Sequence, residues 1–135
     1  MFKRGPIPPL VHGIIDYVFG VALIAAPFVL DFTDNAATAL AIALGLCVLI
    51  LAAFTSWTAG IVKSVPVAAH VMLDYAVSIF LIAAPFLFGF NNDDTASACF
   101  VVLGILGLLL TIATRYVARA PRTQPTPPPP ATPAT

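Results

Sequence analysis

Apolar residues fill four long stretches of the 135-residue chain, and short polar segments separate them. The stretches run from about Val11 to Leu30, Ala36 to Trp57, Ala68 to Phe90 and Ala96 to Ala118. Each has about the 20 residues that a helix needs to cross the hydrocarbon core of a bilayer. None carries a polar stripe, and helices that are apolar all round are typical of contact with lipid. The pattern therefore predicts four transmembrane helices.

The composition excludes several classes of protein. The chain is 60% hydrophobic and 9% charged, whereas an ordinary soluble domain is about 25% charged. Its six cationic residues are too few and too scattered for a nucleic-acid-binding face. The sequence contains no nucleophile–base arrangement, phosphate loop or cofactor motif. We therefore expect a membrane protein that is not an enzyme, takes no cofactor and does not bind nucleic acid.

All the positive charge lies on one side of the predicted spans. The cations stand before the first span, between the second and third, and at the end of the fourth: Lys3, Arg4, Lys63, Arg115, Arg119 and Arg122. The two other connections, 31–35 and 89–94, carry only negative charge. Cationic loops stay in the cytoplasm, so we expect both termini there and both acidic turns outside.

The spans divide the chain into five segments. They are a cytoplasmic N-terminus (1–10), a first hairpin (11–57), a cytoplasmic loop (58–67), a second hairpin (68–118) and a tail (119–135). Seven of the fifteen residues from Pro121 onward are proline. Such a tail favours extended polyproline conformations and buries no core. We expect it to be disordered, and a ligand for a proline-recognising domain is the alternative.

The two hairpins are copies of each other. A shift of 58 residues gives ten identities across the 21 positions 12–32, including His12, Asp16, Tyr17 and Pro27. A shift of 59 aligns the second spans, where Gly45 meets Gly104. Each copy contains two spans, so both copies start on the same side of the membrane. The predicted fold is all-α: a four-helix bundle of two tandem hairpins, parallel about a pseudo-two-fold axis.

Each first span ends in a proline–aromatic pair, Ala26-Pro27-Phe28 in one copy and Ala84-Pro85-Phe86 in the other. A short polar turn and a glycine-containing second span follow. This layout resembles the SPW-repeat membrane proteins, whose two-helix repeat carries Ser-Pro-Trp in its first helix. Here the serine and tryptophan are replaced in both copies. The resemblance implies an integral membrane protein without assigned catalytic residues. A prokaryotic inner membrane is the expected location, since eukaryotic addressing motifs are absent.

The ionisable residues within the spans form two copies of one pair. His12 and Asp16, like His70 and Asp74, are four residues apart and share a helix face. If both pairs face the pseudo-axis, they could hold a divalent metal or relay protons. A structural role is the competing hypothesis, in which each aspartate pairs with its own histidine or with Lys63 or Arg115. Binding of a lipid headgroup is the third.

Other recurrent residues favour structural roles. Pro27 and Pro85 predict a kink near the outer end of their spans, with a gating hinge as the alternative. Four aromatic residues are expected to anchor the bundle at the interface: Tyr17, Trp57, Tyr75 and Tyr116. Small residues in the second spans predict close helix packing. Cys47 and Cys99 lie at different depths, so we expect two buried, inert thiols without a disulfide.

The sequence leaves two main hypotheses for function. The first is a structural or accessory membrane protein that forms a homo-oligomer or joins a larger membrane complex. The alternative is proton or divalent-cation binding or transport through the paired His-Asp residues of the first and third helices. The lipid bilayer is the one partner that both hypotheses share.

Overall fold

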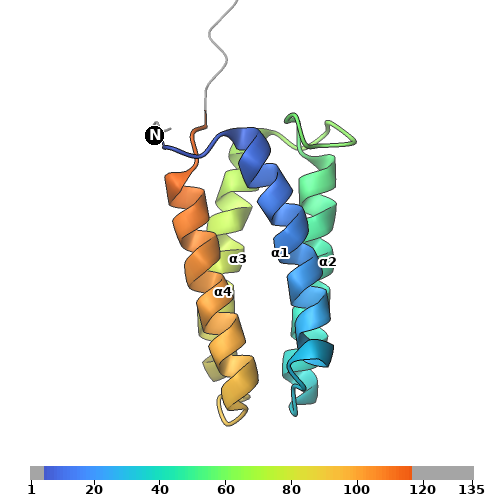
Figure 1. Cartoon of the computed structure of the whole chain (residues 1–135), viewed down its shortest axis with the longest axis vertical. Coiled ribbons are helices and arrows are strands. Elements are labelled where there is room, and N and C mark those ends of the chain that lie inside the picture. Colours follow the sequence, from blue (N-terminus) through green and yellow to red (C-terminus); the bar gives the residue numbers. More distant parts are fainter. Residues whose placement is uncertain (1–4, 117–135) are drawn as a thin grey trace, which may run out of the picture.

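The computed structural model describes residues 5–116, and they form four helices (Figure 1). These are α1 (Pro9–Val29), α2 (Asn35–Phe54), α3 (Val67–Leu87) and α4 (Asp94–Ala113). Each helix is long and apolar enough to cross a membrane, which confirms the predicted four-span, all-α fold. Lys3, Arg4, the predicted end of the last span at Ala118 and the proline-rich tail lie outside the described residues.

Both acidic turns start a helix in the same way. The carboxylates of Asp34 and Asp93 accept hydrogen bonds from the main-chain N–H of Ala37 and Ala96, at the start of α2 and α4. Such caps satisfy N–H groups that have no partner within the helix. On the other side of each turn, α1 and α3 end two residues after Pro27 and Pro85.

The second helix of each hairpin is shorter than predicted. The expected spans reach Trp57 and Ala118, but α2 ends at Phe54 and α4 at Ala113. The next residues, Thr55 and Thr114, are extended. Each forms an isolated bridge to the segment that precedes a first helix, Thr55 to Val65 and Thr114 to Ile7. This main-chain pairing takes the place of another helical turn.

Within each hairpin, a glycine of the second helix lies against the main chain of the first. A Cβ added to Gly45 would lie 2.6 Å from the carbonyl oxygen of Gly20, and one added to Gly104 would lie 2.8 Å from that of Ser78. These distances are too short for a methyl group, so only glycine allows this approach. The close packing of α1 on α2 and of α3 on α4 confirms the two predicted hairpins.

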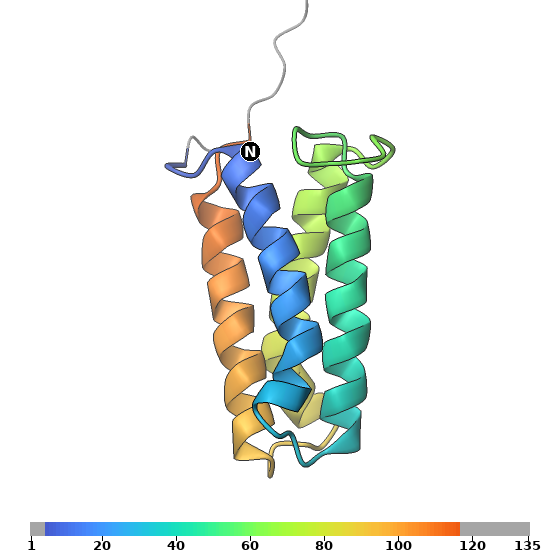
Figure 2. The same ribbon diagram turned by 45° about the vertical axis from the view of Figure 1, so that its right-hand side comes forward.

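The two hairpins stand side by side along the bundle (Figure 2) and share one buried core, which includes Leu23 of α1 and Leu81 of α3. At the acidic-turn end, Asp93 also accepts hydrogen bonds from Thr33 and Asp34 of the other hairpin. Phe90 and Phe100 are fully buried beside this contact, with ring centroids 5.0 Å apart. The opposite end carries the chain segments before α1, between α2 and α3, and after α4 (Figure 1).

Candidate functional site

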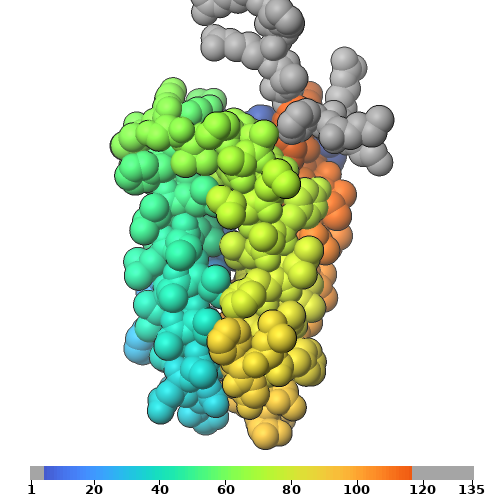
Figure 3. All heavy atoms as spheres, turned by 180° about the vertical axis from the view of Figure 1, so that it is seen from behind, coloured from blue at the N-terminus to red at the C-terminus, as the bar shows by residue number. Residues whose placement is uncertain are grey.

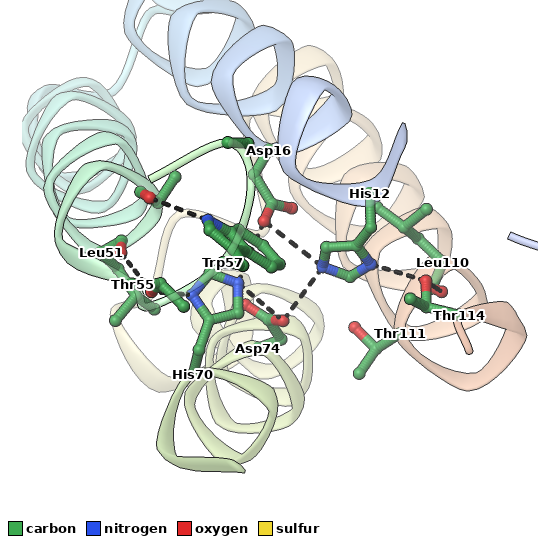
Figure 4. Close-up of polar contacts among 12 residues, drawn as sticks. His12, Asp16, Leu51, Thr55, Trp57, His70, Asp74, Leu110, Thr111 and Thr114 are labelled. Carbon is green, nitrogen blue, oxygen red and sulfur yellow. Dashed lines mark hydrogen bonds and ion pairs between the residues drawn. The ribbon is translucent and has the colours of Figure 1, made fainter. Parts of the chain in front are cut away.

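Four ionisable side chains converge at the end of the bundle opposite the acidic turns (Figure 4). His12 and Asp16 come from α1, and His70 and Asp74 from α3. The Nε2 atom of His12 lies 3.3 Å from Oδ2 of Asp16 and 3.2 Å from Oδ2 of Asp74. The Nε2 atom of His70 lies 3.0 Å and 3.2 Å from the same two oxygens. We call these four residues the His-Asp quartet.

Each aspartate contacts the histidine of both hairpins, so the pairs do not stand apart as two separate ion pairs. Among the described residues, the ion pairs of Asp16 and Asp74 are with the two histidines, and Lys63 and Arg115 do not join them. Both histidines are buried, with 0% of His12 and 1% of His70 exposed. Two charged carboxylates at this depth need cationic partners, because burial of an unpaired charge is very costly.

A threonine from the other hairpin holds each imidazole. Nδ1 of His12 lies 2.7 Å from the hydroxyl of Thr114, and Nδ1 of His70 lies 2.8 Å from that of Thr55. Both hydroxyls donate their hydrogen to the main-chain carbonyl four residues earlier, in Leu110 and Leu51. A hydroxyl has a single hydrogen to donate. It therefore accepts from Nδ1–H, which assigns a proton to Nδ1 of both rings.

This assignment decides what Nε2 can do. In a neutral imidazole with its proton on Nδ1, Nε2 carries a lone pair. That lone pair would face carboxylate oxygens at 3.0–3.3 Å, which is repulsive unless a positive charge lies between them. The charge can be a proton on each ring or a metal ion shared by all four groups.

The spacing of the quartet suits a small metal ion. Two ligands that each lie about 2.0–2.1 Å from a tetrahedral Zn²⁺ are about 3.3 Å apart. Of the six edges of such a tetrahedron, the four N···O distances of 3.0–3.3 Å match this value. One ligand atom from each of the four residues lies within 4.8 Å of all the others. A hydrogen bond from the second ring nitrogen is also the usual arrangement for histidine ligands.

Two aromatic rings cover the histidines on the side away from the helices. The ring centroids of Trp57 and His70 are 4.2 Å apart, and those of Tyr116 and His12 are 5.9 Å apart. Trp57 also donates a hydrogen bond to the carbonyl of Ala52 and is 6% exposed. Burial raises the pKa of the Tyr116 phenol, so this ring stays uncharged above the site. Both residues, expected at the lipid interface, therefore pack within the protein.

Tyr17 and Tyr75, the other two predicted anchors, are partly exposed. The Tyr17 hydroxyl donates a hydrogen bond to the carbonyl of Ala59 in the loop after α2. Cys47 and Cys99 form no disulfide, as expected, but the prediction that both are buried is wrong. Cys47 is exposed, and Cys99 is partly exposed.

On the side of the membrane centre, the two carboxylates border a small cavity of about 20 Å³. Ser78 and Thr111 contribute hydroxyl groups to its wall, and Val77 and Phe19 contribute apolar surface. This volume is about that of one water molecule, which needs polar partners of this kind. The cavity extends the polar region of the quartet toward the bundle interior.

Sequence reasoning found the four ionisable residues but missed the two threonines that orient them. Thr55 and Thr114 correspond under the 59-residue shift that aligns the second spans. That correspondence was the available signal. The correspondence did not indicate a contact with the histidines, because both threonines lie in predicted apolar spans, where a threonine commonly bonds its own helix.

Comparison with known proteins leaves one match. No curated protein and no solved structure matches the chain. The profile of the SPW repeat domain matches residues 10–116. This range includes all four helices and both copies of the His-Asp pair. The chain therefore belongs to the SPW repeat domain family and is a multi-pass membrane protein.

Proposed function

We propose that this membrane protein binds a divalent transition-metal ion at the His-Asp quartet. The observation that carries the proposal is the convergence of two imidazole Nε2 atoms and two carboxylate oxygens at 3.0–3.3 Å. The threonine contacts of both Nδ1 atoms support it, because they leave Nε2 as the nitrogen available to a metal. The proposed role is binding rather than catalysis.

The ligand set favours one class of ion. Imidazole nitrogen suits Zn²⁺, Fe²⁺, Ni²⁺ and Cu²⁺, whereas Mg²⁺ and Ca²⁺ take mostly oxygen ligands in larger number. Two carboxylates and two neutral imidazoles also balance the charge of one divalent ion. A neutral complex is the least costly form in a buried site within apolar helices. We therefore expect Zn²⁺ to bind and Ca²⁺ to leave the quartet empty.

The proposal includes an orientation. The loop with Lys63 and the segment with Arg115 lie at the same end of the bundle as the quartet (Figure 1). The positive-inside rule assigns that end to the cytoplasm. The metal would thus bind close to the cytoplasmic face, in a prokaryotic inner membrane. The exposed apolar faces of the helices meet lipid or, in an oligomer or larger complex, other membrane helices.

A purely structural role is the competing function, and the same distances favour it. Two protonated imidazoles and two carboxylates would form a neutral network that joins the hairpins without a metal. Such a network would stabilise the bundle but would give no dependence on metal ions. A measurement of bound metal therefore distinguishes metal binding from a structural role.

The test measures Zn²⁺ bound to the purified protein in neutral detergent by equilibrium dialysis with metal analysis. We expect one Zn²⁺ per chain, and a loss of affinity above about a hundredfold in His12→Ala and in His70→Ala, because removal of an outer-shell partner alone costs about 10–100-fold. Asp31→Asn, which neutralises a carboxylate at the opposite end of the bundle, should bind Zn²⁺ normally. Failure of the native protein to retain Zn²⁺, or equal retention by both histidine variants, would reject the proposal.

A further inference from the structure

A second feature of the bundle is a groove between α2 and α3. It lies on the face that is turned toward the viewer in Figure 3, which is the back of the molecule in Figure 1. Its volume of about 460 Å³ lies in the range of small-molecule sites, about 300–1,000 Å³. The walls are apolar except at one point, where Asp74 of the quartet reaches the groove. Its other walls include Cys47, Leu51, Phe54, Leu73 and Val77.

The corresponding position between α1 and α4 is filled differently. Phe19 is the repeat counterpart of Val77, and Gly107 is that of Val48. A Cβ added to Gly107 would lie 3.6 Å from the Phe19 ring, so Phe19 packs directly on this glycine. On the α2–α3 side the small Val77 faces Val48, and both line the groove. The exchange of phenylalanine for valine therefore leaves one carboxylate accessible from the side.

The exposure of the two aspartates agrees with this difference. The side chain of Asp74 is 15% exposed and that of Asp16 is 9% exposed. Both histidines contact Oδ2 of Asp74, so its Oδ1 does not take part in the quartet. Trp57 and Tyr116 cover the histidines at the end of the bundle. A ligand therefore reaches Asp74 along the apolar groove rather than past the aromatic rings.

We propose that this groove binds a single-chain amphiphilic cation, namely a long-chain primary ammonium ion. Its ammonium group would donate hydrogen bonds to Asp74, and its hydrocarbon chain would lie along the apolar walls. A hydrated metal ion gains nothing from such walls. The phosphate of a phospholipid headgroup has no hydrogen to donate to the carboxylate of Asp74, which only accepts hydrogen bonds. The proposal goes beyond metal binding and does not depend on it.

The chain supplies both a reporter and a control for the test. Cys47 lines the α2–α3 groove. Cys99 lines another groove, between α1 and α4, which has a volume of about 620 Å³ and no charged residue in its wall. The rate of modification of each thiol by N-ethylmaleimide is measured by peptide mass spectrometry, in neutral maltoside detergent with EDTA present. The probes are dodecylammonium and its uncharged analogue dodecanol.

We expect dodecylammonium to slow modification of Cys47 while modification of Cys99 is unchanged, and we expect no effect of dodecanol on either thiol. Asp74→Asn should weaken this protection about tenfold or more, the usual value of a hydrogen bond to a charged group. Val77→Phe leaves the quartet intact and should abolish protection, because its ring would fill the groove as Phe19 does on the other side.

Three outcomes would overturn the proposal. Equal protection by dodecanol would show an apolar groove without charge recognition. Equal protection of both cysteines would show a general effect of the amphiphile on the micelle. Protection by phosphatidylethanolamine as strong as by dodecylammonium would assign the groove to membrane lipid. EDTA separates these results from the metal site, because loss of Zn²⁺ binding would leave the protection of Cys47 unchanged.

Discussion

The two hairpins are alike where they meet at the quartet and different elsewhere in the interior of the bundle. Each contributes one histidine, one aspartate and one threonine, and each threonine supports the histidine of the other hairpin. Neither hairpin could form this arrangement alone. Away from the quartet, the repeat positions diverge, with Phe19 against Val77 and Ala41 against Phe100.

Because of this divergence, the two hairpins surround the quartet with different side chains. Ser78 and Thr111 place hydroxyl groups beside the carboxylates, whereas their counterparts in the first hairpin, Gly20 and Ala52, have none. At the acidic end, Asp93 bonds to both hairpins while Asp34 caps only its own helix. The duplication thus preserves a shared site, and single substitutions give each side a separate character.

The largest effect is expected where the hairpins are most alike, at the glycines inside each one. Gly45→Ala and Gly104→Ala place a methyl group within 2.8 Å of a main-chain oxygen. A carbonyl oxygen cannot rotate away, so the helices must separate, at a cost of about 1–3 kcal/mol. Gly107→Ala meets only the Ser78 side chain at 2.7 Å and should cost less. Unfolding in detergent measures all three, and equal losses would contradict the packing argument.

A second prediction concerns the two threonines, each of which holds the histidine of the opposite hairpin. Thr55→Val and Thr114→Val remove the acceptors for Nδ1 and should each lower Zn²⁺ affinity about 10–100-fold. Thr38 makes the same hydroxyl-to-carbonyl bond far from the quartet. Thr38→Val should therefore leave Zn²⁺ affinity unchanged. Equilibrium dialysis checks the three variants, and very different losses at Thr55 and Thr114 would break the equivalence of the hairpins.

The acidic turns should differ by less. Asp34→Ala removes one helix cap and should cost about 1 kcal/mol. Asp93→Ala removes a cap together with hydrogen bonds from the other hairpin, so its cost should approach about 2 kcal/mol. Unfolding at neutral pH compares the two variants. A larger loss for Asp34 would show that the contact between the hairpins adds no stability.

Acid should weaken the contact that Asp93 makes with the other hairpin. Hydrogen bonds from the N–H of Ala96, Asp34 and Thr33 lower the pKa of Asp93 below its ordinary value of 3.8. The stabilisation is therefore complete above about pH 4 and is lost as the pH falls through the lowered pKa. The native protein should lose thermal stability in that window more steeply than Asp93→Asn, in which the side chain cannot titrate. Parallel pH profiles of the two proteins would contradict this assignment.

The smallest effect is expected at the second residue after α1 and after α3. Asp31 and Gly89 occupy the same repeat position and share a positive φ, of 51° and 74°. Glycine adopts this conformation without strain, and aspartate adopts it at a small cost. Asp31→Gly should therefore stabilise the protein, and Gly89→Ala should destabilise it, each by less than about 1 kcal/mol. Thermal unfolding measures both, and stabilisation by Gly89→Ala would refute the argument.

The sequence by itself determined the membrane-spanning character, the four helices and the duplication. Apolar stretches of this length have few alternatives to a transmembrane helix, because the main chain must satisfy its own hydrogen bonds in lipid. The pairing of His12 with Asp16 on one helix face also followed from spacing alone. Helix ends at Phe54 and Ala113 did not follow, since hydropathy does not detect the bridges of Thr55 and Thr114.

Only the tertiary structure decided that the pairs meet, that threonines of the opposite hairpin orient the imidazoles, and that Trp57 and Tyr116 cover them. Helical periodicity shows which residues share a face, but the rotation of one hairpin against the other depends on side-chain packing across the bundle. The groove that reaches Asp74 has the same origin. It depends on the size of one side chain, Val77, at a contact between helices that are distant in sequence.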